Sequence, residues 1–151
     1  MAKVVAFANQ KGGVAKTTTT LNLGVAVQEM GRRVLVVDMA PQGNLTMSLG
    51  LDPDSASPSM YDVLVSGAHM EETLAHGEID VAVASLDLAA VEIALSSLIG
   101  RERALSKALL QVRDNYDYIF IDTPPSLGLL TVNALTASNS VLVPVQCEYL
   151  S

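Results

Sequence analysis

Cysteine, tryptophan and long apolar runs are scarce or absent in this chain of 151 residues. Its only cysteine is Cys147, so no disulfide bond can form within the chain, and such sparse cysteine usage suits a reducing compartment. No apolar run reaches the roughly 20 residues that a membrane-spanning helix needs, and no charged segment followed by an apolar one opens the sequence. These absences predict a soluble, cytoplasmic protein with no membrane partner.

Composition also disfavours two kinds of site, a zinc centre and a large nucleic-acid surface. The two histidines, His69 and His76, have no cysteine or histidine at metal-ligand spacing, so we expect no zinc site. The formal net charge is −7 and no stripe of lysine and arginine stands out, which argues against strong nucleic-acid binding by this chain. Basic residues between positions 101 and 113 are interleaved with acidic ones and are interpreted as a solvated helix face.

Strand-like and helix-like segments alternate along the sequence. Half of the residues are hydrophobic, and 151 residues leave room for one domain with a buried core. Runs of β-branched residues without polar alternation indicate strands covered on both faces, and their alternation with helices indicates a parallel sheet with right-handed crossovers. We therefore predict an α/β fold with a mostly parallel, doubly wound sheet. The expected strands are residues 4–8, 34–37, 79–83, 118–121 and 140–145, and the expected helices begin near 21 and cover 86–98, 102–112 and 131–137, with a short helix opening at 59–64.

Residues 10–18, with the sequence QKGGVAKTT, join the first expected strand to the first expected helix. A strand, a glycine turn carrying lysines and then a helix present backbone N–H groups to a phosphate. A lysine adds a positive charge for the outer phosphates, and a threonine hydroxyl can ligate Mg²⁺. The segment therefore predicts nucleoside-triphosphate binding. The alternative, a plain strand–helix connection, is disfavoured by the two lysines and the threonines.

The same segment departs from the ordinary P-loop pattern, G-x-x-x-x-G-K-[ST]. Counted back from Lys16, the two glycines of that pattern would fall at Gln10 and Ala15. What remains, KGGVAKTT with an additional lysine at Lys11, resembles the deviant Walker A box of the ParA/MinD family of ATPases, KGGVGKTT. Alanine at position 15 fits if its backbone φ is negative; otherwise its Cβ strains the turn or crowds the phosphate.

Two further motifs follow apolar strands and carry acidic residues at the strand ends, where ligands bind in doubly wound folds. Asp122 opens a DTPP run that resembles the second motif of the family. A carboxylate there can hold Mg²⁺ through water or, alternatively, cap the following turn. Residues 36–44, VVDMAPQGN, resemble the family's switch segment DxDPQGN, with Asp38 at its first aspartate and Ala40 in place of its second. The PQGNLT run resembles the ParA/Soj partition branch and not MinD.

The resemblance implies a role for each of these residues, with ATP and Mg²⁺ as cofactors. Lys16 contacts the β- and γ-phosphates, and Lys11 reaches the phosphates of a partner subunit across a nucleotide-sandwich homodimer. The second aspartate of the switch orients or deprotonates the attacking water, so Ala40 implies slow hydrolysis or none. The other phosphate-binding positions are Gly12, Gly13, Val14, Ala15, Thr17 and Thr18. The implied metal ligands are Thr17, Asp38 and Asp122.

The resemblance spans the whole chain but only the N-terminal part of the usual family domain. Residues 1–151 are therefore interpreted as a single P-loop ATPase domain that is incomplete at its C-terminus. The implied function is a ParA-like ATPase of chromosome or plasmid segregation, stimulated by a ParB-like partner. The family binds DNA without sequence preference, and hence the nucleoid, through a C-terminal region that this chain lacks. Two alternatives stay open: a P-loop small-molecule kinase or ligase, and a nucleotide-dependent positioning switch for cargo other than DNA.

Overall fold

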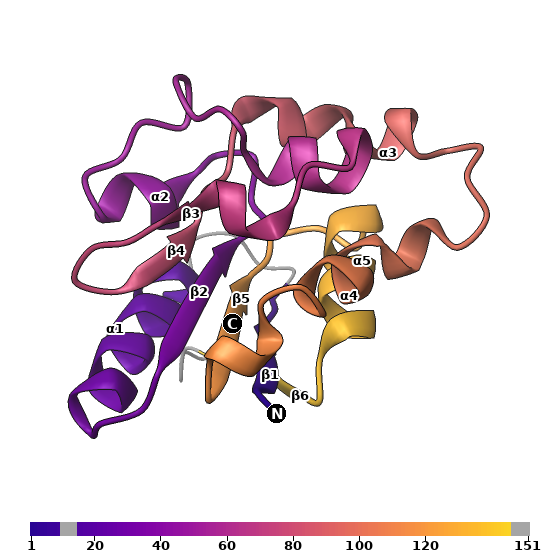
Figure 1. The fold of residues 1–151 in the computed structure, drawn as a ribbon. Helices are drawn as coiled ribbons and strands as arrows, with labels where there is room; N and C mark the ends of the chain where they lie inside the picture. Colours follow the sequence, from indigo (N-terminus) through magenta and orange to yellow (C-terminus); the bar gives the residue numbers. More distant parts are fainter. Residues whose placement is uncertain (10–14, 146–151) are drawn as a thin grey trace.

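A single twisted sheet forms the centre of the fold (Figure 1). The computed structural model describes residues 1–9 and 15–145, and in this part of the chain six strands pair in the order β3-β4-β2-β5-β1-β6. All neighbouring strands are parallel except the β3–β4 pair. The predicted α/β fold with a mostly parallel sheet is thereby confirmed. The strands are β1 (Lys3–Phe7), β2 (Val34–Asp38), β3 (Leu74–Ala75), β4 (Asp80–Ala82), β5 (Tyr118–Asp122) and β6 (Ser140–Leu142).

Helices cover both faces of the sheet, as a doubly wound fold requires. Figure 1 shows α1 (Lys16–Glu29) on one side of the strands, and α4 (Ala104–Leu109) with α5 (Leu129–Ala137) on the other. Each side has its own cluster of buried apolar residues. A Cβ at Gly24 of α1 would lie 3.1 Å from a methyl carbon of Val36. Glycine at this position therefore lets α1 lie close to β2, which fixes the start of the helix relative to the strand ends.

The helices expected over 86–98 and 102–112 are both shorter than predicted. The first segment is a 3₁₀ turn, η3 (Leu86–Ala90), and one α-helical turn, α3 (Val91–Ala94). The Ser96 hydroxyl then donates to the Ile93 carbonyl oxygen at 2.9 Å, a local bond that competes with a continued helix. The second segment is present as α4, which ends at Leu109. The remaining segments are α2 (Asn44–Ser48), the π-helical turn η1 (Asp62–Ser66) and the 3₁₀ turns η2 (Met70–Thr73), η4 (Arg101–Arg103) and η5 (Arg113–Asn115). None of the helices in the described ranges combines the length and apolar character needed to cross a bilayer.

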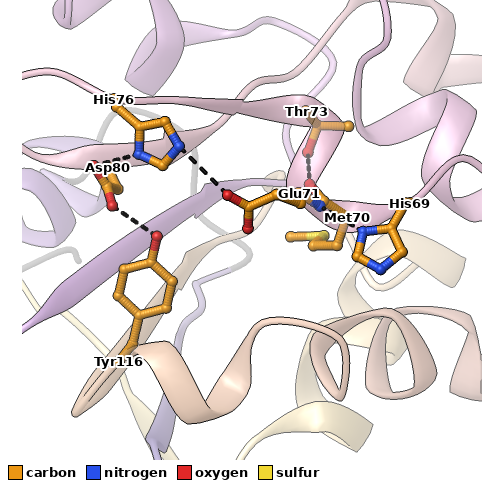
Figure 2. Close-up of polar contacts among 7 residues, drawn as sticks. All are labelled: His69, Met70, Glu71, Thr73, His76, Asp80 and Tyr116. Atoms are coloured by element: carbon orange, nitrogen blue, oxygen red, sulfur yellow. Dashed lines mark hydrogen bonds and ion pairs between the residues drawn. The ribbon is translucent and has the colours of Figure 1, made fainter.

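A small polar cluster fastens the β3–β4 edge of the sheet (Figure 2). Asp80, which opens β4, accepts a hydrogen bond from the Tyr116 hydroxyl at 2.7 Å and lies 3.0 Å from His76 Nδ1. His76 Nε2 lies 3.6 Å from a carboxylate oxygen of Glu71. The hydrogen bond with Asp80 is the main cause of the raised pKa of His76, and burial is the main cause of the raised pKa of Tyr116. The cluster belongs to the amino-terminal end of β4, away from the carboxyl ends of the strands.

The Asp80→Asn substitution is expected to lower the pKa of His76. Because the folded-state pKa lies above the unfolded value of about 6.5, the His76–Asp80 pair stabilises the fold fully below that pH, and its contribution is lost as the pH rises through the folded pKa. The His76 side chain is 58% exposed, so the gain should stay below about 1 kcal/mol. Titration of the His76 ring protons by NMR measures the shift, with Tyr116→Phe as the variant that keeps the pair. An unchanged pKa in Asp80→Asn would contradict the pairing.

Candidate functional site

The carboxyl ends of β1, β5 and β2 lie side by side. In the register of the sheet, Asp122 is opposite Phe7 on one side and Asp38 on the other. The Met39 N–H donates to the Asp122 carbonyl oxygen at 2.9 Å, which ties the switch segment to β5. The Thr123 hydroxyl donates to the Phe7 carbonyl oxygen at 2.7 Å, which ties the DTPP motif to β1. The structure therefore brings the switch and DTPP motifs to one edge of the sheet, beside the strand that leads into the Walker A segment.

Helix α1 begins at the residues predicted to bind phosphate. Lys16 is its first residue and is 7% exposed. The hydroxyl of Thr17 donates to Asp122 Oδ2 at 2.6 Å, so the start of the helix is joined directly to the end of β5. The N-cap residue is Ala15, which has no side-chain cap to offer, and the first turn contains no acidic residue. Such an uncapped helix start suits an anionic ligand.

The other predicted phosphate-binding residues fall into two groups. Ala15 has a φ of −67°, so the condition under which alanine fits is met. Thr18 lies in the first turn of α1 with an exposed side chain. Four residues, Lys11, Gly12, Gly13 and Val14, lie outside the described residues, and their roles stay predictions.

Asp122 combines deep burial with an unused oxygen. Its Oδ2 accepts the Thr17 hydroxyl, whereas its buried Oδ1 has no hydrogen-bond partner among the described residues. Burial raises the pKa of Asp122 to about 6; the bond from Thr17 opposes this shift and the neighbouring Asp38 adds to it. A buried carboxylate oxygen without a partner is unfavourable, so this position fits a cation.

A metal ion at Asp122 would need further oxygen ligands. In the described ranges, no group of three or more His, Cys, Asp or Glu side chains could hold a metal ion by itself. The Thr17 hydroxyl, water and the oxygens of a bound phosphate would complete the set, and this is the usual environment of Mg²⁺ in phosphate sites. The residues present therefore fit Mg²⁺ together with a phosphate-bearing ligand.

Asp38 is equally buried, but both of its oxygens are in use. Oδ1 accepts the Ala40 N–H at 3.1 Å, and Oδ2 accepts both the N–H and the hydroxyl of Thr46, at 2.9 and 2.7 Å. Burial raises the pKa of Asp38, and these hydrogen bonds oppose the shift. Asp38 therefore organises the switch segment, in addition to the metal role predicted for it. Thr46 is absent from the predicted site residues; its only signal in the sequence is its place at the end of the PQGNLT run.

Ala40 lies in a tight turn just beyond β2. Its side chain is nearly buried, with the residue 6% exposed, and its carbonyl oxygen accepts the Gly43 N–H at 2.9 Å. Gly43 has a φ of +67°, and a Cβ there would lie 2.7 Å from Pro53 Cγ. Only glycine satisfies both constraints. The turn therefore fixes position 40 beside the strand ends, where the family's second aspartate would stand.

A hollow adjoins this turn. It has a volume of about 370 Å³, and its walls come from the switch turn, from η3 and α3, and from the segment that joins β5 to α5. Lining residues include Pro41, Gln42, Leu88, Glu92 and Pro125. No pattern in the sequence predicts this hollow, because its walls come from three separate segments.

The sequence matches the family AAA_31, described as an AAA domain, over residues 2–151. The chain belongs to this family, which is the ParA/MinD family. It is 51% identical over 152 residues to the sporulation initiation inhibitor protein Soj of Bacillus subtilis, covering 99% of this chain and 60% of Soj. It is 46% identical over 154 residues to the chromosome partitioning protein ParA of Caulobacter vibrioides, covering 99% of this chain and 58% of that protein. The predicted ParA/Soj resemblance is thereby confirmed.

A solved structure of a similar protein shows the same fold. The cobyrinic acid a,c-diamide synthase of Mycobacterium smegmatis, crystallised with a bound ATP analog and magnesium, superposes with a TM-score of 0.97 at 48% identity, covering 100% of this chain and 63% of that one. The predicted P-loop fold class is confirmed by this match. The chain spans 58–63% of the length of these three proteins.

Proposed function

We propose that the chain binds ATP and Mg²⁺ at the carboxyl ends of β1, β5 and β2, and acts as the nucleotide switch of a ParA/Soj-type partition ATPase. The observation that carries the proposal is the Thr17–Asp122 hydrogen bond of 2.6 Å, which joins the start of α1 to the end of β5. It places a hydroxyl beside the carboxylate whose Oδ1 has no partner in the described structure. Such oxygen donors are typical of a Mg²⁺ site that is shared with phosphates.

Each residue at the strand ends has a proposed role in ligand binding. Lys16 provides a positive charge to the β- and γ-phosphates, and the N–H groups at the start of α1 bind phosphate oxygens. Thr17 and Asp122 hold Mg²⁺, with Asp38 as the neighbouring carboxylate. When bound, the cation neutralises charge on the phosphates.

The proposed hydrolysis is slow because of Ala40. A methyl group at this nearly buried position neither orients a water molecule nor accepts its proton. Phosphoanhydride hydrolysis depends mainly on positioning and charge stabilisation, and the resemblance assigns the positioning of water to an aspartate here. A long-lived ATP-bound state favours any association that depends on ATP.

The proposed partners extend beyond this chain. The similarity to the Soj and ParA relatives supports a homodimer around ATP, stimulated by a ParB-like protein. Non-specific DNA binding and nucleoid association are proposed for the whole protein, since the chain spans only about three-fifths of its relatives. A cytoplasmic location follows from the same proposal.

A small-molecule ligase is the second candidate. The Mycobacterium smegmatis protein is called a cobyrinic acid a,c-diamide synthase, and the hollow of about 370 Å³ beside the switch turn would hold a substrate near the phosphates. The PQGN switch favours the partition ATPase instead. ADP release that depends on adding cobyrinic acid and an amide donor would identify the ligase; ADP release unaffected by both would identify the partition ATPase.

The Lys11→Ala substitution is expected to abolish ATP-dependent dimers while sparing nucleotide binding. The reason is that Lys11 is proposed to contact the partner's phosphates, at roughly 1.5–3 kcal/mol for each charge-assisted contact. In a twofold dimer two such contacts are lost, so dimer affinity should fall at least about 100-fold. Light scattering with and without Mg-ATP measures the dimer, and Lys3→Ala, which removes an exposed lysine, is the matched control. Dimers that persist would remove Lys11 from the interface.

A further inference from the structure

Three buried hydroxyl side chains lie between the switch segment and the helical turns η1 and η3. Thr46, Ser59 and Ser85 are 0%, 2% and 5% exposed. They come from different segments: Thr46 from α2, Ser59 from the loop before η1, and Ser85 from the start of η3. Buried hydroxyls require hydrogen-bond partners, so the partners of each show what it connects.

Thr46 connects the switch to the end of β4. Its hydroxyl donates to Asp38 Oδ2 at 2.7 Å, and the Thr46 hydroxyl oxygen accepts the Ala84 N–H at 3.1 Å. The Thr46 N–H also donates to Asp38 Oδ2, at 2.9 Å. The Thr46 hydroxyl thus donates one hydrogen bond to the switch aspartate and accepts another from the backbone just beyond β4.

Ser85 and Ser59 continue the connection from Ala84 to η1. Ser85 follows Ala84 directly, and the Ser59 hydroxyl donates to Ser85 Oγ at 2.9 Å. The Ser59 N–H donates to a carboxylate oxygen of Asp62, the first residue of η1, at 2.8 Å. Hydrogen bonds, together with the covalent link between Ala84 and Ser85, therefore connect Asp38 with the beginning of η1.

We propose that Thr46 is a positioning residue that holds Asp38 in register with the end of β4, and that the Thr46–Ala84 and Ser59–Ser85 hydrogen bonds transmit a movement of the switch to η3 and η1. A shift of Asp38 must either carry Thr46 with it or leave buried polar groups without partners, which is unfavourable. Since Thr46 also holds Ala84, the shift reaches η3. This matters because Leu88 of η3 and Pro41 of the switch line the same hollow.

Amide hydrogen exchange of the whole chain, with and without saturating Mg-ATP, tests this inference, which rests on the proposed function. In the unmodified chain, Mg-ATP is expected to slow exchange in residues 38–48 and also in 84–88 and 62–66, by about tenfold or more. In Thr46→Val, Mg-ATP should still slow exchange in residues 38–48 but no longer in residues 84–88 and 62–66. Thr46→Ser, which restores the hydroxyl, should recover all three. A structural role of Thr46 in packing alone would not produce this rescue.

Ser85→Ala removes the hydrogen bond between Ser59 and Ser85 but leaves the contacts of Thr46 in place. It should keep the response of residues 38–48 and 84 and lose that of 62–66. Circular dichroism shows whether Thr46→Val folds. If it does not, Thr46→Ser and Ser85→Ala provide the test. The inference is overturned if the response of residues 62–66 to Mg-ATP persists in Ser85→Ala or is lost in Thr46→Ser. Remote responses that persist in a folded Thr46→Val overturn it as well.

Failure of the proposed function would be recognised separately. If the unmodified chain shows no Mg-ATP binding by calorimetry, the proposed function is wrong, and the positioning role is then judged without nucleotide. The Ala84 amide should exchange faster in Thr46→Val than in the unmodified chain and at the original rate in Thr46→Ser. Equal rates in all three proteins overturn the positioning role.

Discussion

The Lys16→Ala substitution is expected to weaken ATP binding about 100-fold or more. Lys16 is 7% exposed and forms no ion pair with any of the described residues. Its charge lies at the start of α1, where the first turn holds no acidic residue, so this end of the helix favours a negatively charged ligand. Loss of one or two charge-assisted hydrogen bonds, at roughly 1.5–3 kcal/mol each, accounts for the expected fold-change. Isothermal titration calorimetry with Mg-ATP measures it.

Stability separates a binding role of Lys16 from a folding role. Without nucleotide, Lys16→Ala should unfold at a similar or slightly lower temperature than the unmodified chain, because Lys16 attracts the buried Asp122 carboxylate. With Mg-ATP, the rise in unfolding temperature seen for the unmodified chain should be absent in the variant. Lys107→Ala, which removes an exposed lysine of α4, is the matched control. Unchanged ATP affinity in Lys16→Ala would contradict the phosphate-binding assignment.

The central strands were predictable from sequence, and the edges of the sheet were not. Strands β2 and β5 consist of apolar runs covered on both faces, and such runs stand out in the sequence. Strand β3 has two residues, too few to show any periodicity, and was not predicted. The helix expected over 86–98 shows why pattern alone is insufficient: apolar spacing is satisfied there by a 3₁₀ turn and a single α-helical turn.

The same distinction holds for the candidate site. That Asp38 and Asp122 lie at the same edge of the sheet followed from parallel strands, because the carboxyl ends of such strands share one edge. The contacts of Thr46 did not follow, because they depend on the path of the turn through Gly43 and on its packing against Pro53. A turn that returns a side chain to its own strand end leaves no periodic pattern in the sequence.

The Ala40→Asp substitution is expected to raise steady-state ATP hydrolysis by at least about tenfold, since a positioned general base typically contributes 10²–10⁴-fold. Position 40 is the second residue beyond the end of β2, and its backbone already contacts Asp38. A carboxylate there would orient the attacking water and accept its proton. Phosphate release, measured at protein concentrations at which Mg-ATP-dependent dimers form, tests the expectation.

A carboxylate at position 40 is also expected to destabilise the fold without ligand, and this effect separates the role of its charge from that of its shape. It would be a third acidic group beside buried Asp38 and Asp122, so like-charge repulsion should lower the unfolding temperature without ligand, and Mg-ATP should restore part of the loss. The asparagine of Ala40→Asn has nearly the same volume as aspartate but no charge. This variant should therefore show neither the loss of unfolding temperature nor its partial recovery with Mg-ATP. Hydrolysis that rises equally in Ala40→Asn would mean that orienting water is sufficient without proton transfer. Hydrolysis unaltered in Ala40→Asp would show that the slow turnover has another cause than the missing aspartate.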